Sequence, residues 1–252
     1  MKKLFLLSIV SLFVLISANI NLTPLARTHG PRIKVKNGQS TNWSGYAVET
    51  NLSNPQNNAV SNVQGSWVVP AVDCSGSTSN KYSSAWVGID GYSDGSVEQT
   101  GTEHDCINGS AQYYAWYEMY PKFGYKVPLT VHAGDTISAS VKYLSNGKFQ
   151  LTLQSSNGQS FSTTQKSARA GRQSAEWVVE APSSSGGVLP LANFGTTSIS
   201  SAQATLNNVV GNVQSFANDR IDMVTSGGTV IKAQTSSLQN SGTAFSVTWL
   251  HE

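Results

Sequence analysis

The chain has 252 residues, of which 12% are charged, and its formal net charge is +2. This is about half the usual share of charged residues, and polar uncharged residues, which hydrogen-bond at any pH, fill the surface instead. Six of the 16 Lys and Arg residues precede Glu49, whereas all 14 acidic residues lie at or after it, so the body of the chain carries a net charge of −4. No basic patch interleaved with aromatic residues indicates nucleic-acid binding.

The first 18 residues have the layout of a signal peptide. Lys2 and Lys3 precede an apolar run over residues 4–16, and the small residues Ser17 and Ala18 follow it. The run is shorter than the roughly 20 residues that span a bilayer, although an uncleaved N-terminal anchor is the alternative. We therefore expect a secreted, extracellular protein with no membrane association after cleavage.

The next segment, residues 19–40, has no sustained apolar period and contains Pro24 and Pro31. It is predicted to be a short basic propeptide or a mobile arm. Residues 41–252 then form a single domain, because all-β domains often reach this size without splitting.

The body of the chain alternates short strand patterns with turn residues. The candidate strands are rich in Val, Ile, Thr and aromatic residues, and clusters of Gly, Asn, Asp and Ser separate them. No window of a dozen residues has a helical period. This pattern predicts an all-β fold, a β-sandwich of two packed antiparallel sheets. The expected strands are residues 44–50, 63–69, 83–89, 97–101, 112–120, 137–143, 149–154, 160–164, 175–181, 198–205, 220–224, 229–232 and 245–250.

The only cysteines, Cys74 and Cys106, are predicted to form a disulfide, because an even number of cysteines in an exported chain favours pairing. Closing a loop of about 30 residues contributes roughly 3–4 kcal/mol in the chain-entropy model. Their spacing does not match a zinc site, and we expect neither a metal nor another cofactor.

Serine catalysis has little support in this sequence. The string Gly91 to Gly95 places Ser93 in a Gly-x-Ser-x-Gly pattern, but a strand pattern follows it where a nucleophile elbow needs a helix. A hairpin connection is the better interpretation, and its acidic spacing does not match a calcium loop either. His104, in an expected loop, could be a base or a metal ligand, but a solvated residue is the better interpretation. His132, at a strand-to-turn junction, is interpreted as a surface residue, so a serine triad has little positive support.

Paired carboxylates are the better indication of chemistry. Residues two apart in a strand share a face, so Glu118 lies with Trp116 and Tyr120, and Glu176 lies with Glu180. A carboxylate beside large aromatic residues needs a cleft or a costly burial, although each glutamate could also be a hydrogen-bonded edge residue. The pattern fits either a two-carboxylate glycosidase or an acid peptidase.

Several segments resemble the signature segments of the eqolisins, the glutamic peptidases. They occur in order along the chain and are Asn-Trp-Ser-Gly at 42–45, Ala-Trp-Val-Gly-Ile-Asp-Gly at 85–91, Gln-Thr-Gly at 99–101, Ala-Trp-Tyr-Glu-Met-Tyr-Pro at 115–121, Ala-Glu-Trp-Val-Val-Glu at 175–180 and Ala-Asn-Phe-Gly at 192–195. The chain resembles a secreted, prokaryotic-type member of the family. The basic excision site of two-chain fungal members is not evident, which leaves the processing scheme open.

The resemblance implies two long, curved sheets of the concanavalin or lectin jelly-roll type, with catalysis on the concave face. It implies a monomeric acid endopeptidase that acts on proteins or peptides without a cofactor. The catalytic pair falls on Gln99 and Glu180. The residues that line or support the cleft fall on Trp43, Trp86, Asp90, Glu118 and Tyr120.

A glutamine and a glutamate can catalyse hydrolysis at an acid pH at which a histidine would be protonated and could not act as a base. Glu180, with an ordinary pKa near 4.3, would take a proton from water and return it to the leaving amine. Gln99 would donate to the oxyanion at any pH. The alternatives are a glycoside hydrolase that uses Glu118 and Glu180 and a non-catalytic glycan-binding module.

The basic leader suggests a further hypothesis. At neutral pH Arg27, Arg32, Lys34 and Lys36 would lie against an acidic cleft and block it, and protonation of the carboxylates would weaken the attraction.

Overall fold

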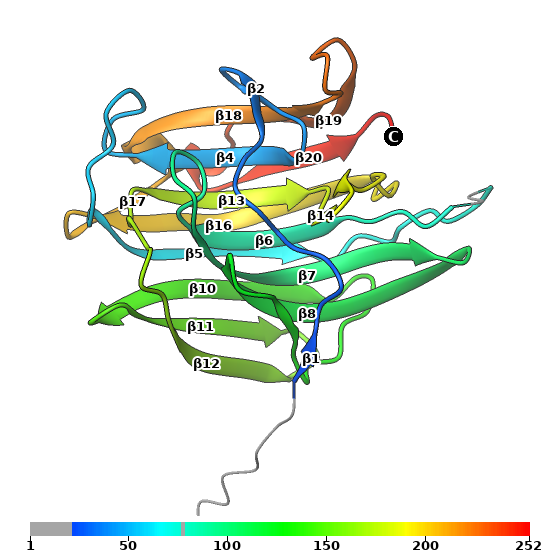
Figure 1. Cartoon of the computed structure of the whole chain (residues 1–252), viewed down its shortest axis with the longest axis horizontal. Coiled ribbons are helices and arrows are strands. Elements are labelled where there is room, and N and C mark those ends of the chain that lie inside the picture. The colour runs from blue at the N-terminus through cyan, green and yellow to red at the C-terminus, as the bar shows by residue number, and fades with distance from the viewer. Residues whose placement is uncertain (1–21, 77–78) are drawn as a thin grey trace, which may run out of the picture.

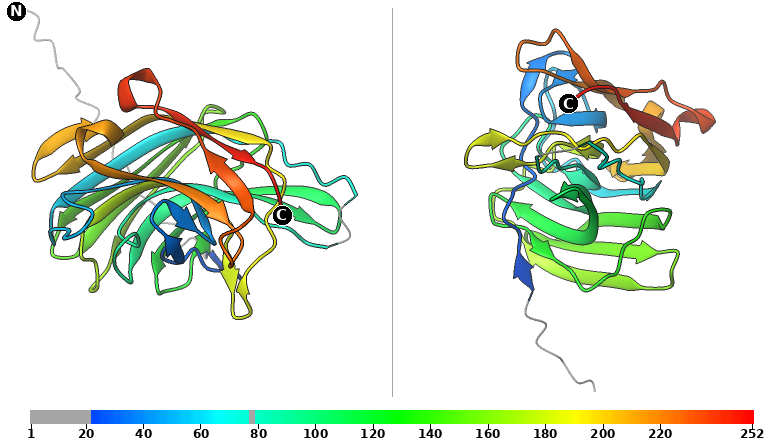
Figure 2. Two further views of the ribbon diagram at one scale, coloured as in Figure 1. Left: turned by 90° about the horizontal axis from the view of Figure 1, so that it is seen from above. Right: turned by 90° about the vertical axis from the view of Figure 1, so that its right-hand side faces the viewer.

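The computed structural model describes residues 22–76 and 79–252, and the predicted signal peptide at residues 1–18 lies outside them. The described chain is built almost entirely of strands in two facing layers (Figure 1, Figure 2). Its helices are two 3-10 turns, η1 (Val213–Ser215) and η2 (Asn240–Gly242). Within these residues no helix has the length and apolar character that crossing a membrane requires. The predicted β-sandwich is confirmed.

The first sheet is antiparallel, in the order β1-β9-β8-β7-β6-β13-β4-β18. Its strands span β1 Thr23–Pro24, β4 Trp43–Glu49, β6 Ser84–Ile89, β7 Val97–Ile107, β8 Ser110–Tyr120, β9 Tyr125–Lys126, β13 Ser174–Glu180 and β18 Ala217–Val224.

The second sheet has the order β12-β11-β10-β5-β16-β20-β19. β18 pairs with both β4 and β19 and so joins the two sheets at one edge. The remaining strands span β2 Lys34–Lys36, β3 Gln39–Ser40, β5 Val60–Val68, β10 Thr136–Ser145, β11 Lys148–Ser155, β12 Ser160–Lys166, β14 Ser183–Ser184, β15 Gly187–Val188, β16 Thr196–Leu206, β17 Val209–Asn212, β19 Ile231–Thr235 and β20 Phe245–Trp249.

Side-chain alternation along each strand fills the core between the sheets. On β13, Trp177 and Val179 enter this core, whereas Glu176 and Glu180 point to the other face of the same sheet, as the sequence predicted. The Trp177 indole finds a partner in the carbonyl of Gln64, 2.7 Å away, so its buried N–H is satisfied.

The strand β7 is longer than the sequence suggested and corrects the assignment of His104. The expected strand ended at residue 101, but β7 continues to Ile107 and pairs with β8 along its whole length. His104 is therefore a buried strand residue, hydrogen-bonded to the Thr102 hydroxyl at 2.8 Å, and burial lowers its pKa to about 3. The prediction of a solvated loop histidine was wrong because both faces of this polar stretch are covered. His132 is exposed, as predicted.

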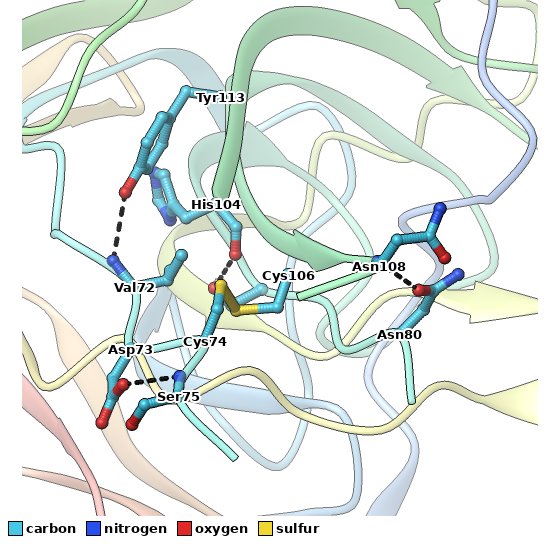
Figure 3. The surroundings of a disulfide bond; sticks show 10 residues. Val72, Asp73, Cys74, Ser75, Asn80, His104, Cys106, Asn108 and Tyr113 are labelled. Atoms are coloured by element: carbon cyan, nitrogen blue, oxygen red, sulfur yellow. Dashed lines mark hydrogen bonds between the residues drawn. A yellow bond between two sulfur atoms is a disulfide. The ribbon is translucent and has the colours of Figure 1, made fainter. Parts of the chain in front are cut away.

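The predicted disulfide between Cys74 and Cys106 is present (Figure 3), with an S–S distance of 2.00 Å. It ties the loop before β6 to the end of β7. Beside it, the Ser83 hydroxyl donates to the carbonyl of His104 at 2.7 Å, and the Val72 N–H donates to the Tyr113 hydroxyl at 3.2 Å (Figure 3). The disulfide thus fixes the strand that carries Gln99.

The connection from β6 to β7 is a hairpin with no helix, so the interpretation of the Gly91 to Gly95 string as a hairpin is confirmed. The Asp94 carboxylate accepts the N–H of Gly91 at 2.8 Å. Ser93 therefore lies in a turn without the strand–turn–helix geometry of a nucleophile elbow.

Candidate active site

The first sheet buries a second apolar cluster on the face turned away from the core, which we call the site face. Its largest members are Trp43, Trp86 and Trp116, with Leu25 and Val178 beside them. Because both faces are covered, every residue of β4, β6 and β13 is buried. A sheet with one face in water would instead alternate buried and exposed residues.

The cover of the site face is the N-terminal segment of the chain itself. In Figure 1 it runs in dark blue from β1 to β2, across β7, β6 and β13. β1 pairs with β9 at one end, Thr28 forms a bridge with Ser183, and the N–H of Arg32 donates to the carbonyl of Gly91 at 2.9 Å. The described part of the predicted propeptide therefore lies on the sheet as an extended peptide.

Glu180 lies at the end of β13, where two N–H donors hold its carboxyl group. The Trp86 indole N–H donates to Oε2 at 2.8 Å, and the Asn42 amide donates to Oε1 at 3.3 Å. Complete burial raises the pKa of Glu180 well above its ordinary value, although the two hydrogen bonds favour the carboxylate. While the segment covers the site, the protonated form of Glu180 is therefore favoured.

Two glycines allow Trp86 to reach Glu180. A Cβ atom at Gly101 would lie 2.4 Å from the carbonyl oxygen of Ala85 and 2.5 Å from Cβ of Trp86. One at Gly88 would lie 2.8 Å from the Trp86 ring and 3.1 Å from Cβ of Gln99. Gly101, the glycine of the Gln-Thr-Gly motif, is thus required because the backbone of β6 approaches it closely, and Gly88 is required because the Trp86 ring passes over it.

Gln99 points from β7 at the backbone of the covering segment. Its amide Nε2 donates to the carbonyl oxygen of His29. The next two carbonyls are also bound, by the Trp43 indole N–H on Gly30 at 3.1 Å and by the Asn42 amide on Pro31 at 3.2 Å. Among the hydrogen bonds of the described residues, none joins Gln99 to Glu180 directly. Gln99 and Asn42, which holds Glu180, instead bind neighbouring carbonyls of one peptide.

The remaining predicted cleft residues lie in different settings. Glu118 accepts the main-chain N–H of His29 at 2.9 Å, and Tyr120 lies beside Gly30, at which a Cβ atom would approach its ring to 3.6 Å. Asp90 lies apart from them at the end of β6. It accepts the N–H groups of Arg172 and Gln173, each at 2.7 Å, so it supports the loop before β13.

His29 is one of the residues that sequence reasoning missed, because it lay in a segment taken for a propeptide or mobile arm. Its ring stacks on Trp116 with a centroid distance of 3.7 Å and an interplanar angle of 7°. Nε2 lies 2.6 Å from Oε1 of Glu103, and Nδ1 lies 3.0 Å from Oε2 of Glu118. Burial lowers the pKa of His29 and raises that of Glu103 to about 7.

Glu103 was missed because the expected strand stopped at residue 101. Continued alternation from Gln99 puts Glu103 and Asp105 on the same face, so the strand period was the signal that could have identified them. In the structure Asp105 also lies under the segment, where it binds Arg27 at 2.6 Å.

The arginines of the segment pair with acidic residues at both ends of the site. In addition to its bond with Asp105, Arg27 lies 4.3 Å above the Tyr82 ring. Arg32 binds Asp219 at 3.1 Å and lies 3.7 Å from the centre of the Tyr92 ring. Lys34 and Lys36, by contrast, are exposed on β2.

A two-layered β-sandwich that presents a glutamine, glutamates and tryptophans on one covered sheet face has the architecture expected of an eqolisin. The Peptidase A4 family, whose model matches residues 41–249, is the family to which the chain belongs. Among the described residues no cluster of His, Cys, Asp and Glu suited to holding a metal ion occurs.

Individual relatives agree with this assignment. Aspergillopepsin-2 of Aspergillus niger is 30% identical to this chain over 189 residues, which are 66% of this chain and 64% of that protein. Among solved structures, aspergilloglutamic peptidase from Aspergillus niger is 29% identical, with a TM-score of 0.60 over 68% of this chain and 99% of that one. Scytalido-glutamic peptidase with a transition state analog inhibitor, 24% identical, shares the fold with a TM-score of 0.69 over 83% of this chain and 98% of that one.

Proposed function

We propose that the protein is an acid-acting endopeptidase in which Glu180 is the general base and acid and Gln99 stabilises the oxyanion. One observation carries the proposal: the Gln99 amide donates to a main-chain carbonyl of an extended peptide that lies along the site face. An oxyanion donor has to make this contact with a substrate. Membership of the Peptidase A4 family supports the same chemistry.

The proposed reaction uses one water molecule and one proton relay. Glu180 removes a proton from water as the water oxygen attacks the peptide carbonyl carbon, and negative charge develops on the carbonyl oxygen that Gln99 binds. When the C–N bond breaks, Glu180 passes its proton to the leaving amine, which leaves an acid and an amine. The N–H donors of Trp86 and Asn42 would orient the carboxylate.

Opening of the site is required for this role. With the segment in place, burial raises the pKa of Glu180. Once water enters, the pKa moves toward the ordinary value near 4.3, and the carboxylate becomes available at mildly acid pH.

Two substitutions test the assignment with denatured protein as substrate at acid pH. Glu180→Gln removes the base and should lower kcat by about 10²- to 10⁴-fold, and Gln99→Ala should lower it by about 10²- to 10³-fold, both without loss of the fold. Glu176→Gln, on the same face of the same strand, is the matched control and should stay active. Near wild-type activity of Glu180→Gln would contradict the proposal.

The same purified protein tests the two alternatives, a glycoside hydrolase that uses Glu118 and Glu180 and a non-catalytic glycan-binding module. Incubation with xylan and glucan should release no sugar and show no binding, whereas denatured protein should yield peptide fragments. On the basis of the sequence we propose with this activity that the enzyme is secreted, monomeric and of the prokaryotic type. We also propose that residues 41–252 are its catalytic domain and that residues 19–40 are a propeptide or mobile arm.

We also propose that the N-terminal segment keeps the enzyme inactive until it leaves the site face. The ion pairs of Arg27 and Arg32 and the contact of Gln99 with the segment's own backbone support this role. A chain that begins at Ser40 should be active at once after transfer to acid pH, whereas the unprocessed chain should show a lag. Equal activity of the two forms at neutral and acid pH would rule out the block.

A further inference from the structure

The short strand β9 is paired with the body of the chain on one side only. That partner is β8, and on the other side β9 pairs, among the described residues, with β1 of the N-terminal segment alone. When the segment leaves the site face, the main-chain groups of residues 124–126 on that side lose their partners. We call this row of groups the β9 edge. An open strand edge is a template for pairing with another extended chain.

The register between β1 and β9 shows which main-chain groups the β9 edge uses. Pro24 lies opposite Tyr125 in the antiparallel pair, and the N–H of the next residue, Leu25, donates to the carbonyl of Gly124 at 2.9 Å. In such a pair only alternate residues bond directly across the ladder, so the nitrogen of Pro24 faces away from β9. A proline fits at this position because no N–H is needed there, whereas a proline in place of Leu25 would lose the bond to Gly124.

The side chain of Leu25 fills a space that Gly124 leaves open. Leu25 is almost fully buried and belongs to the apolar cluster of the site face. A Cβ atom at Gly124 would lie 2.9 Å from Cδ1 of Leu25 and 3.3 Å from Cβ of Glu118. Gly124 is not in the left-handed region, so the space for the leucine, and not the backbone conformation, accounts for the glycine.

The β9 edge leads directly to the proposed reaction site. Between the two, the main chains of Thr28 and Ser183 exchange hydrogen bonds of 2.9 Å in both directions, and the carbonyl of His29 then accepts from Gln99. In the proposed reaction, the residue whose carbonyl binds Gln99 precedes the bond to be cleaved. Counted back from that bond, Leu25 occupies the fifth position, and one extended peptide contacts the β9 edge and Gln99 at the same time.

We propose that the β9 edge is a substrate-binding exosite, which takes up an extended, unfolded polypeptide as an added strand and accommodates an apolar side chain at the fifth position before the cleaved bond. The inference rests on the proposed peptidase function. Main-chain pairing supplies affinity for many sequences, and the space above Gly124 supplies selection at one position. Unfolded proteins and long peptides are therefore better substrates than short peptides that do not reach the β9 edge.

The first experiment uses internally quenched peptides with the same residues around the cleaved bond and the full-length protein after activation at acid pH. One peptide is acetylated at the fourth position before the bond, and the other extends to the eighth position with leucine at the fifth. The longer peptide should have a kcat/KM at least about tenfold higher, mainly through KM, because the contact is the same in the ground state and the transition state. Equal values in a protein that cleaves both peptides would overturn the exosite and leave the proposed function intact.

Changes to the peptide backbone distinguish strand addition from apolar contact alone. Proline at the sixth position should keep the advantage of the longer peptide, because that nitrogen faces away from β9. N-methyl-leucine at the fifth position keeps the side chain but removes the N–H that Gly124 accepts, so it should remove most of the advantage. Loss of the advantage with both peptides, or with neither, would refute the pairing.

A variant of Gly124 tests the selection at the fifth position. Gly124→Ala narrows the space and should lower the ratio of kcat/KM for the leucine peptide to that for an otherwise identical peptide with alanine at this position. Gly95→Ala is the matched control, because a Cβ atom at Gly95 meets no atom within 4 Å, and it should leave the ratio unchanged. An unchanged ratio in Gly124→Ala would overturn the assignment of this space to the fifth side chain.

A last experiment does not depend on catalysis. In the full chain at neutral pH, Gly124→Ala should lower the urea midpoint of unfolding by more in the wild-type background than in Leu25→Ala, because the shorter side chain removes the clash with the new methyl group. Additive effects would overturn the contact between Leu25 and the β9 edge. Coupling in a protein that cleaves no peptide would leave the β9 edge as a peptide-binding strand and refute only the peptidase function.

Discussion

Replacement of His29 by glutamine should make the covering segment leave the site face at a lower pH. His29 is completely buried against Glu103 and Glu118, with Arg27 and Asp105 close by, and burial lowers its pKa. A group whose pKa is lower in the covered form binds its proton more readily in the open form. Acidification below about 6.5, the ordinary pKa of histidine, therefore favours opening.

The carboxyl groups act in the opposite direction. Burial raises the pKa of Glu103 to about 7, and it raises those of Glu118 and Glu180 above their ordinary values. These groups bind protons more readily in the covered form, so they hold the segment more firmly as the pH falls toward their ordinary values near 4. The expectation that protonated carboxylates would loosen the segment through lost attraction is not supported by these shifts.

The magnitude follows from linkage. While His29 stays neutral in the covered form, each pH unit below about 6.5 favours opening by up to about 1.4 kcal/mol. Each carboxyl group opposes this with the same limiting slope, but its effect stops growing below about pH 4, where it is protonated in both forms. Below about pH 4 the opposition of the carboxyl groups no longer grows, so His29 is the group whose protonation still shifts the balance toward opening there, as long as it stays neutral in the covered form.

Glutamine at position 29 can donate and accept hydrogen bonds but does not titrate. The substitution therefore removes only the contribution of histidine protonation to the opening of the segment. After a jump from pH 7 to pH 3.5, acrylamide quenching of tryptophan fluorescence should rise more slowly in His29→Gln than in the wild type, because the site-face tryptophans stay covered. The appearance of peptidase activity should be delayed in parallel. The exposed His132→Gln is the matched control. Identical quenching kinetics in His29→Gln and the wild type would refute the linkage argument.

Two further substitutions probe the scaffold around the pair. Gly101→Ala forces a Cβ atom to within 2.5 Å of Trp86, so it should lower the free energy of unfolding in urea by about 1–3 kcal/mol. It should also lower kcat, because the Trp86 indole is displaced from Glu180. Unchanged stability and activity would show that the backbone at Gly101 moves to accommodate the methyl group at little cost. Replacing Cys74 and Cys106 together by serine should cost roughly 3–4 kcal/mol of unfolding free energy with activity retained at 25 °C, and an unchanged denaturation midpoint would contradict the predicted contribution of the disulfide.

Local periodicity predicted the part of the site that lies within single strands. The period of two placed Glu118 beside Trp116, and Glu176 with Glu180, on faces that the structure bears out. It could not choose among these glutamates, because each satisfies the same pattern. Nor could it single out Gln99, whose distinguishing contact is with a carbonyl 70 residues away in sequence.

Contacts between distant segments account for what the sequence did not reveal. His29 is separated from Glu103 by 74 residues and from Glu118 by 89, and no local pattern reports a pairing across such a distance. A leader with two prolines and four basic residues carries no strand period, although it is bound as an extended peptide. For Asp90 the motif predicted a place near the cleft, but it did not indicate that this residue supports the loop before β13.

The surroundings of Gln99 and Glu180 explain how a neutral amide can serve as the hydrogen-bond donor and a weakly acidic carboxyl group as the proton acceptor. Gln99 faces a main-chain carbonyl and must donate, whereas Glu180 faces two N–H groups, from Trp86 and Asn42, and must accept. These donors favour the carboxylate, and burial under the segment opposes it. Removal of the segment relieves the burial but leaves the donors in place. The pH at which a full-length preparation becomes active should therefore follow the opening of the segment, and the pH dependence of the opened enzyme should follow Glu180.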